Sequence, residues 1–128
     1  MYKPALVAAA ISGLLAVIIG AFGAHVLKDL VSPDQLPVWE KGVQFQFYHT
    51  FALLATGMLY ATYPFRSLRV ATMLFLLGIA MFSGSLYAMV GLSAHGTSIG
   101  AAGVITPVGG LCFIAGWACL LLAFLKKH

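Results

Sequence analysis

The strongest constraint on this chain is a tract of 56 residues, Val70 to Leu125, that contains no Lys, Arg, Asp or Glu. About 20 apolar residues cross a hydrocarbon layer of about 30 Å, so this tract is long enough for two crossings and a turn. Two further apolar stretches precede it, Pro4 to Ala24 and Gly42 to Phe65. We therefore predict a single transmembrane domain over residues 1–128. Its predicted spans are residues 4–26, 40–63, 70–92 and 105–125.

The composition excludes the other broad classes of protein. Of the 128 residues, 62% are apolar and 8% are charged, whereas an average soluble domain has about 45–50% and about 25%. A small soluble domain exposes too much of its surface to hide this apolar excess, and intrinsic disorder requires low hydrophobicity and high charge. The predicted fold class is therefore all-α, an integral membrane four-helix bundle.

The basic residues predict how the spans are oriented. An even number of spans places both termini on one side, together with Lys3, Arg66, Arg69, Lys126 and Lys127. Only two basic residues, Lys28 and Lys41, fall on the opposite side. Because cytoplasmic loops carry an excess of Lys and Arg, both termini are expected in the cytoplasm. The net charge of +4 is accompanied by no nucleic-acid recognition motif, so no nucleic-acid partner is expected.

The first span has a second interpretation, a cleavable signal peptide. Lys3 precedes it, and Ala21-Phe22-Gly23 loosely resembles a cleavage site. Its apolar core is longer than that of a usual signal peptide, so we expect this segment to be retained as a span.

Small residues recur at steps of three and four along three of the predicted spans. Such rows let helix backbones approach closely in a membrane, so each row is predicted to lie at a helix interface. The rows are Ala9, Gly13, Ala16, Gly20 and Gly23; Ala80, Gly84, Ala88 and Gly91; and Gly109, Cys112, Gly116, Cys119 and Ala123. We interpret the two cysteines as packing residues, because the chain has no CxxC motif.

The connections carry their own signals. Ser32 is predicted to cap a short helix with Pro33 at its first position and Gln35 reaching back, as in a capping box, and Pro37 then predicts a bend into the second span. Trp39 suits the headgroup region. The last turn is predicted within residues 93–107, where Ser, Gly, Thr and Pro collect.

Hydrogen-bonding side chains concentrate in the halves of the spans predicted to face outward. They form a candidate polar pocket of His25, Gln46, His49, Thr50, Ser83, Ser85, Tyr87 and Thr106. Lipid satisfies none of their hydrogen bonds, so they must face other helices or water. Two interpretations stay open: a polar pocket or proton-handling site, and a hydrogen-bonded clamp that sets helix register.

Specific chemistry finds little support in the sequence. No zinc-protease, GxSxG or P-loop motif is present, so we predict no catalytic residue, no metal site and no cofactor, and enzymatic activity is not expected. Two alternatives remain. One is translocation of a small solute or protons by an oligomer; the other is haem or quinone binding, with His25 and His49 meeting at the outer mouth.

Four segments of the chain resemble one known family. They are GAFGAH (residues 20–25), QFQFYH (44–49), FSGSLY (82–87) and ITPVGG (105–110), with Gly116-Trp117 following. In this order they resemble the YgdD/YwdK-type family of small membrane proteins of unknown function, over nearly the whole chain. The resemblance implies a four-span, multi-pass protein of the bacterial inner (plasma) membrane. It brings no assigned activity, and it singles out six of the pocket residues: His25, Gln46, His49, Ser83, Tyr87 and Thr106.

The sequence therefore leads us to expect an uncharacterised small inner-membrane protein. We expect a non-enzymatic binding or accessory role with a polar pocket near the outer face. The expected partners are the lipid bilayer and either further copies of the chain or a membrane complex.

Overall fold

The computed structural model describes residues 1–97, 100 and 102–126. All regular structure in these residues is helical, which confirms the all-α prediction. The α-helices are α1 (Lys3–His25), α2 (Leu36–Leu59), α3 (Arg66–Gly78), α4 (Gly84–Ala94) and α5 (Ala102–Leu125). Two short 3-10 turns, η1 (Leu27–Asp29) and η2 (Pro33–Gln35), join α1 to α2, and a π-helix, η3 (Ile79–Ser83), joins α3 to α4 without a break.

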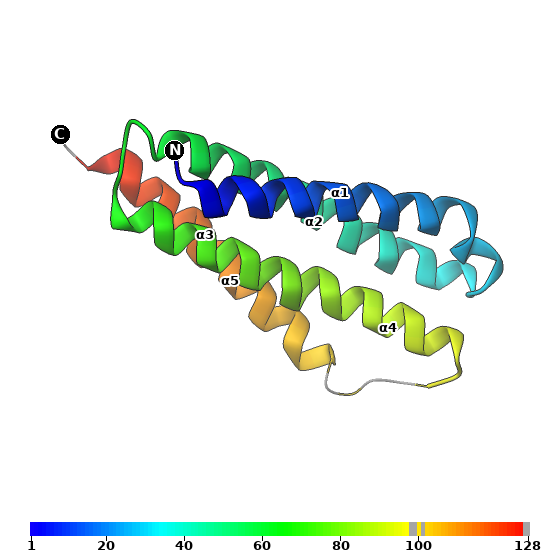
Figure 1. Ribbon diagram of the computed structural model, residues 1–128. Helices are drawn as coiled ribbons and strands as arrows, with labels where there is room; N and C mark the ends of the chain where they lie inside the picture. The colour runs from blue at the N-terminus through cyan, green and yellow to red at the C-terminus, as the bar shows by residue number, and fades with distance from the viewer. Residues whose placement is uncertain (98–99, 101, 127–128) are drawn as a thin grey trace.

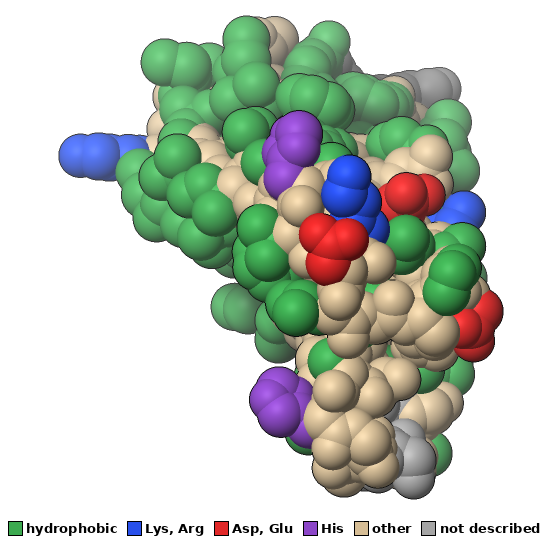
Figure 2. All heavy atoms as spheres, turned by 90° about the vertical axis from the view of Figure 1, so that its right-hand side faces the viewer, with side chains coloured by type: hydrophobic (Ala, Val, Ile, Leu, Met, Phe, Trp, Pro, Cys, Tyr) green, Lys and Arg blue, Asp and Glu red, His purple; other side chains and the backbone are tan. Residues whose placement is uncertain are grey.

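The long helices lie side by side in two antiparallel pairs (Figure 1). α1 packs along α2, α5 packs along α3 and η3, and α2 joins the pairs through α3, η3 and α4. Both chain ends lie at one end of the molecule, which we call the terminal end. The opposite end carries η1, η2 and the end of α4, and we call it the connection end. Figure 2 looks onto it and shows acidic, basic and histidine side chains gathered there.

Three helical stretches of the described residues are long and apolar enough to cross a membrane. They are Lys3–Asp29, Arg66–Ala94 and Gly103–Leu125. Their outward faces are exposed Leu, Ile, Val and Phe side chains, such as Leu14 at 63% and Ile114 at 66%. Continuous apolar exposure of this kind suits contact with lipid. α2 is not among the three, so its crossing stays a prediction.

The core lies where small residues of α1, α2 and α3 surround two phenylalanine rings, Phe75 and Phe113. Two of the predicted small-residue rows lie at helix interfaces. In the α1 row, Gly13 faces Thr50. In the α5 row, a Cβ on Gly109 would lie within 2.9 Å of the Met81 backbone carbon.

The row predicted for the third span is wrong. Ala80 and Ala88 are exposed, and a Cβ on Gly84 or Gly91 would meet nothing within 4 Å. α4 instead buries Ser85, Leu86 and Val90, which lie on a different face of the helix from the predicted row.

The connections agree in part with their predictions. Ser32 precedes η2 and Pro33 is its first residue, but no side chain caps the turn, so the capping box is not formed. Instead, a hydrogen bond with Ser32 lowers the pKa of the Asp34 carboxyl. The last connection is shorter than predicted, because α5 begins at Ala102 and contains Pro107. Only one backbone hydrogen bond is lost there, since Pro107 lies just beyond the first turn. Residues 98, 99 and 101 of that prediction, and the predicted cytoplasmic Lys127, lie outside the described residues.

Candidate functional site

The predicted polar residues meet around the side chain of Gln46, on the face of α2 between α1 and α4. Its Nε2 donates to the Ser12 carbonyl oxygen at 2.9 Å, and its Oε1 accepts a hydrogen bond from the Tyr87 hydroxyl at 2.7 Å. The Ser12 hydroxyl is in turn hydrogen-bonded to the Thr50 hydroxyl at 2.7 Å. Gln46, Ser12 and Thr50 are all buried. One amide side chain therefore connects three helices, and both of its ends are occupied.

The two predicted serines, Ser83 and Ser85, form further hydrogen bonds between helices. The Ser83 hydroxyl donates to the Gly42 carbonyl oxygen at 2.7 Å, which joins η3 to α2. The Ser85 hydroxyl donates to the Phe82 carbonyl oxygen at 2.8 Å, so it accepts from the Thr106 hydroxyl at 2.5 Å and joins α4 to α5. Each hydroxyl has its partner inside the protein, as lipid surroundings require.

His49 forms a separate connection between α2 and α5. Its Nδ1 lies 2.7 Å from the Phe45 carbonyl oxygen, which can only accept, so Nδ1 carries the hydrogen. Its Nε2 accepts from the Trp117 indole N–H at 3.1 Å, and its ring stacks on Phe113 with centroids 3.5 Å apart. An apolar groove of about 460 Å³ opens beside the ring. Because both ring nitrogens are already hydrogen-bonded, a ligand in this groove would find no free nitrogen on His49.

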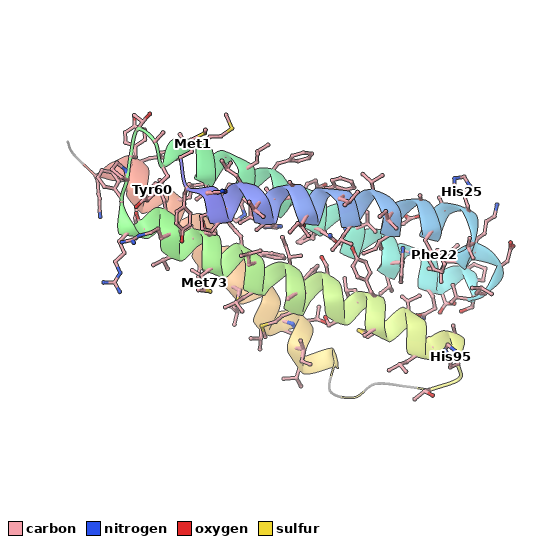
Figure 3. The ribbon with its side chains drawn as sticks, in the orientation of Figure 1. Met1, Phe22, His25, Tyr60, Met73 and His95 are labelled. Atoms are coloured by element: carbon pink, nitrogen blue, oxygen red, sulfur yellow. The ribbon has the colours of Figure 1, made fainter. Side chains whose placement is uncertain are left out.

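His25 does not join the other pocket residues. It is exposed at the end of α1, where Figure 3 labels it at the connection end. Gly13 of α1 lies opposite Thr50 of α2, and Gly23 lies opposite Trp39. His49 therefore lies opposite the region of Gly13. His25 is about eleven residues, or about 16 Å, further along the α1 axis. The two histidines therefore do not form the facing pair that a bis-histidine haem would require. His95 is also exposed at this end.

Sequence reasoning missed three contributors to these contacts. Ser12 is the lone hydroxyl of a stretch otherwise made of apolar residues, and that isolation was a usable signal. Trp117 follows a quoted motif, but sequence alone does not show which helix it reaches. Trp39 donates its indole N–H to the Ile19 carbonyl oxygen at 3.0 Å, and its ring packs 4.8 Å from that of Tyr87. It is thus bound within the protein, and its predicted place in the headgroup region stays a prediction.

A second groove lies between α1 and α2 at the connection end. Its volume is about 230 Å³, and we call it the α1–α2 groove. It is lined by Gly20, Gly23, Ala24, Leu36, Trp39, Glu40, Val43 and Gln44. The floor is apolar, whereas Glu40 and Gln44 are exposed. Lys41, next in sequence, donates to the Gln44 side-chain oxygen at 3.3 Å. In the described part of the chain, no three His, Cys, Asp or Glu side chains gather as a metal site.

Comparison with known proteins places these residues in a family. Residues 19–110 match the model of a family described as a protein of unknown function, DUF423. The chain belongs to this family. The match spans all eight residues of the predicted pocket, from His25 to Thr106.

Proteins similar to this chain are named as membrane proteins. The chain is 43% identical over 117 residues to the UPF0382 membrane protein SAB0533 of Staphylococcus aureus (strain bovine RF122 / ET3-1), covering 91% of each chain. It is 38% identical over 125 residues to the UPF0382 membrane protein YwdK of Bacillus subtilis (strain 168), covering 97% of this chain and 98% of the relative. These matches confirm the predicted YwdK-type resemblance. No solved structure matches the chain.

Proposed function

We propose that the protein crosses the bacterial inner membrane four times, with both termini in the cytoplasm, and binds a membrane lipid without catalysis. The lipid lies in the α1–α2 groove, in the outer leaflet. It is a zwitterionic phospholipid whose headgroup carries a primary ammonium.

The packing of α2 along α1 supports the fourth crossing. At one end of this pair Gly23 of α1 packs against Trp39, and at the other Gly57 of α2 packs against Leu6. A helix that accompanies a spanning helix from end to end must span as well. The polar side chains of α2 that lie at depth are covered by other helices, which removes most of the cost of placing them in the membrane.

The charges support the orientation. Of the basic residues that the structure describes, Lys3, Arg66, Arg69 and Lys126 belong to the terminal end, and Lys28 and Lys41 belong to the connection end. The positive-inside tendency then places the terminal end in the cytoplasm.

The observation that carries lipid binding is an apolar hollow with the Glu40 carboxylate in its lining and the Lys41 ammonium hydrogen-bonded to Gln44 of the same lining. The Glu40 carboxylate can accept hydrogen bonds from an ammonium, and the neighbouring Lys41 ammonium can donate to a phosphate. Gly20, Gly23, Ala24 and Val43 give the groove an apolar floor, and an acyl chain can lie along this surface.

The hydrogen bonds of the candidate polar pocket favour a clamp that sets helix register over a pathway for protons or solutes. Its hydroxyl and amide groups are hydrogen-bonded to neighbouring helices. In the cytoplasmic half, Thr56 and Thr72 donate to carbonyl oxygens of their own helices. These contacts support binding over translocation of protons or solutes.

A native mass spectrometry experiment on the detergent-purified protein tests the proposal. We expect Glu40→Gln to weaken binding of phosphatidylethanolamine by about fivefold, because one charge-assisted hydrogen bond is lost. Asp34→Asn is the matched control, since it removes an exposed carboxylate at the same end of the molecule that does not line the groove. Phosphatidylcholine, which has no ammonium hydrogen, should bind both variants and the original protein alike. Equal losses in the two variants, or no loss in either, would contradict the proposal.

A further inference from the structure

A different groove lies at the terminal end, between the start of α1 and the start of α3. It has a volume of about 540 Å³ and is lined by Tyr2, Arg66, Arg69, Val70, Met73 and Leu74. We call it the arginine groove. Arg66 and Arg69 are three residues apart in the first turns of α3, so their side chains share one helix face. Both are exposed.

These two arginines have no acidic side chain within reach. The chain has three acidic residues in all, Asp29, Asp34 and Glu40. All three belong to the connection end, where α1 runs into α2. The 23 residues of α1 separate the two ends by about 35 Å. No acidic side chain can therefore pair with the arginines, which leaves their charge available to an anionic ligand.

The rest of the lining indicates what kind of molecule that is. Beyond the guanidinium groups the groove continues along Val70, Met73 and Leu74 of α3, and Met73 is 61% exposed. Figure 3 labels Met73 on α3, further from the terminal end than the start of that helix. The groove therefore has a cationic mouth and an apolar floor. A ligand that matches both parts carries a negative head and an aliphatic tail.

We infer that the arginine groove binds a phospholipid with an anionic headgroup. Two guanidinium groups on one face present planar, multidentate donors that fit a single phosphate diester. Tyr2 belongs to the same lining, and its hydroxyl can supply a further donor. One acyl chain follows the apolar floor. Basic pockets of this kind on the cytoplasmic side suit anionic lipid headgroups. The assignment to the cytoplasmic leaflet rests on the orientation proposed above, whereas binding itself does not.

The test is lipid titration of the detergent-purified protein by native mass spectrometry, with phosphatidylglycerol as the anionic probe and phosphatidylcholine as the neutral one. The double variant Arg66→Gln/Arg69→Gln should bind phosphatidylglycerol about tenfold more weakly. The matched control Lys3→Gln/Lys126→Gln removes two charges from the same end outside the groove lining. It should change binding by less than about twofold. Phosphatidylcholine should bind weakly to all three proteins.

Three outcomes would overturn the inference. The first is an equal loss in the lysine control, which would show a diffuse charge effect. The second is full binding by the double arginine variant. The third is that inorganic phosphate alone raises the unfolding temperature of the protein as much as phosphatidylglycerol does, which would show a soluble phosphate site. Unchanged phosphatidylethanolamine binding by the arginine variant would show that it is folded, because the α1–α2 groove shares no residue with this one.

Discussion

At the scale of single residues, the side chain of Gln46 connects three helices. Its amide holds α1 through the Ser12 carbonyl and α4 through the Tyr87 hydroxyl. In a membrane no water replaces a lost partner at this depth, so removing the amide leaves the Tyr87 hydroxyl without its acceptor.

We therefore predict that Gln46→Leu destabilises the protein by about 1–3 kcal/mol. Gln44→Leu is the control, because Gln44 is exposed on the same helix and its loss should cost less than about 0.5 kcal/mol. The measurement is the free energy of unfolding in mixed detergent micelles. If the two variants proved equally stable, the clamp interpretation of the cluster would be wrong.

The choice of residues was predictable from the sequence, but their partners were not. Gln46, His49 and Thr50 stand out because polar groups are rare in apolar spans. That Gln46 reaches Ser12 while His49 reaches Trp117 depends on helix rotation and register, which no local pattern encodes. His25 shows the same limit, since similar depth suggested a meeting with His49 that the antiparallel register does not allow.

At the scale of the helical elements, the π-helix η3 and Gly109 of α5 depend on each other. A Cβ at Gly109 would lie within 2.9 Å of the Met81 backbone carbon and the Phe82 Cα, so the obstacle is backbone rather than a flexible side chain. Only a glycine lets α5 approach this turn so closely.

Gly109→Ala is expected to destabilise the protein by about 1–3 kcal/mol, because α5 must move away from η3. Gly84→Ala, five residues from the start of η3, places its Cβ in open space and should change stability by less than about 0.5 kcal/mol. Thermal unfolding of both variants in the same detergent compares them. A Gly109 variant as stable as the Gly84 variant would show that the two helices are not in this contact.

The elements also show which parts of the fold could be predicted. Long apolar stretches predicted α1, α5 and the combined run of α3, η3 and α4 within a few residues of their ends. α5 begins three residues before the predicted span, because Pro107 was taken as a turn signal although proline is tolerated close to a helix start. The π-helix left no signal in composition, and small residues alone did not show which face of α4 is buried.

At the scale of the whole molecule, α2 decides the topology. Its polar residues, among them Glu40, Lys41 and Gln44, leave it outside the set of helices apolar enough to span on their own. Its contacts with α1 run along the full length of both helices. The account therefore requires α2 to cross because its neighbours cover its polar face, so that the two ends of α2 lie on opposite sides of the membrane.

Cysteine labelling of the two connections that flank α2 tests this requirement most directly. Asp34→Cys and Thr62→Cys, each in a background with Cys112→Ala and Cys119→Ala, place a thiol at an exposed position before and after the helix. A maleimide that cannot cross membranes should label the Asp34 variant in intact spheroplasts and the Thr62 variant only after lysis. Labelling of both variants before lysis, or of both only after it, would show that α2 does not cross.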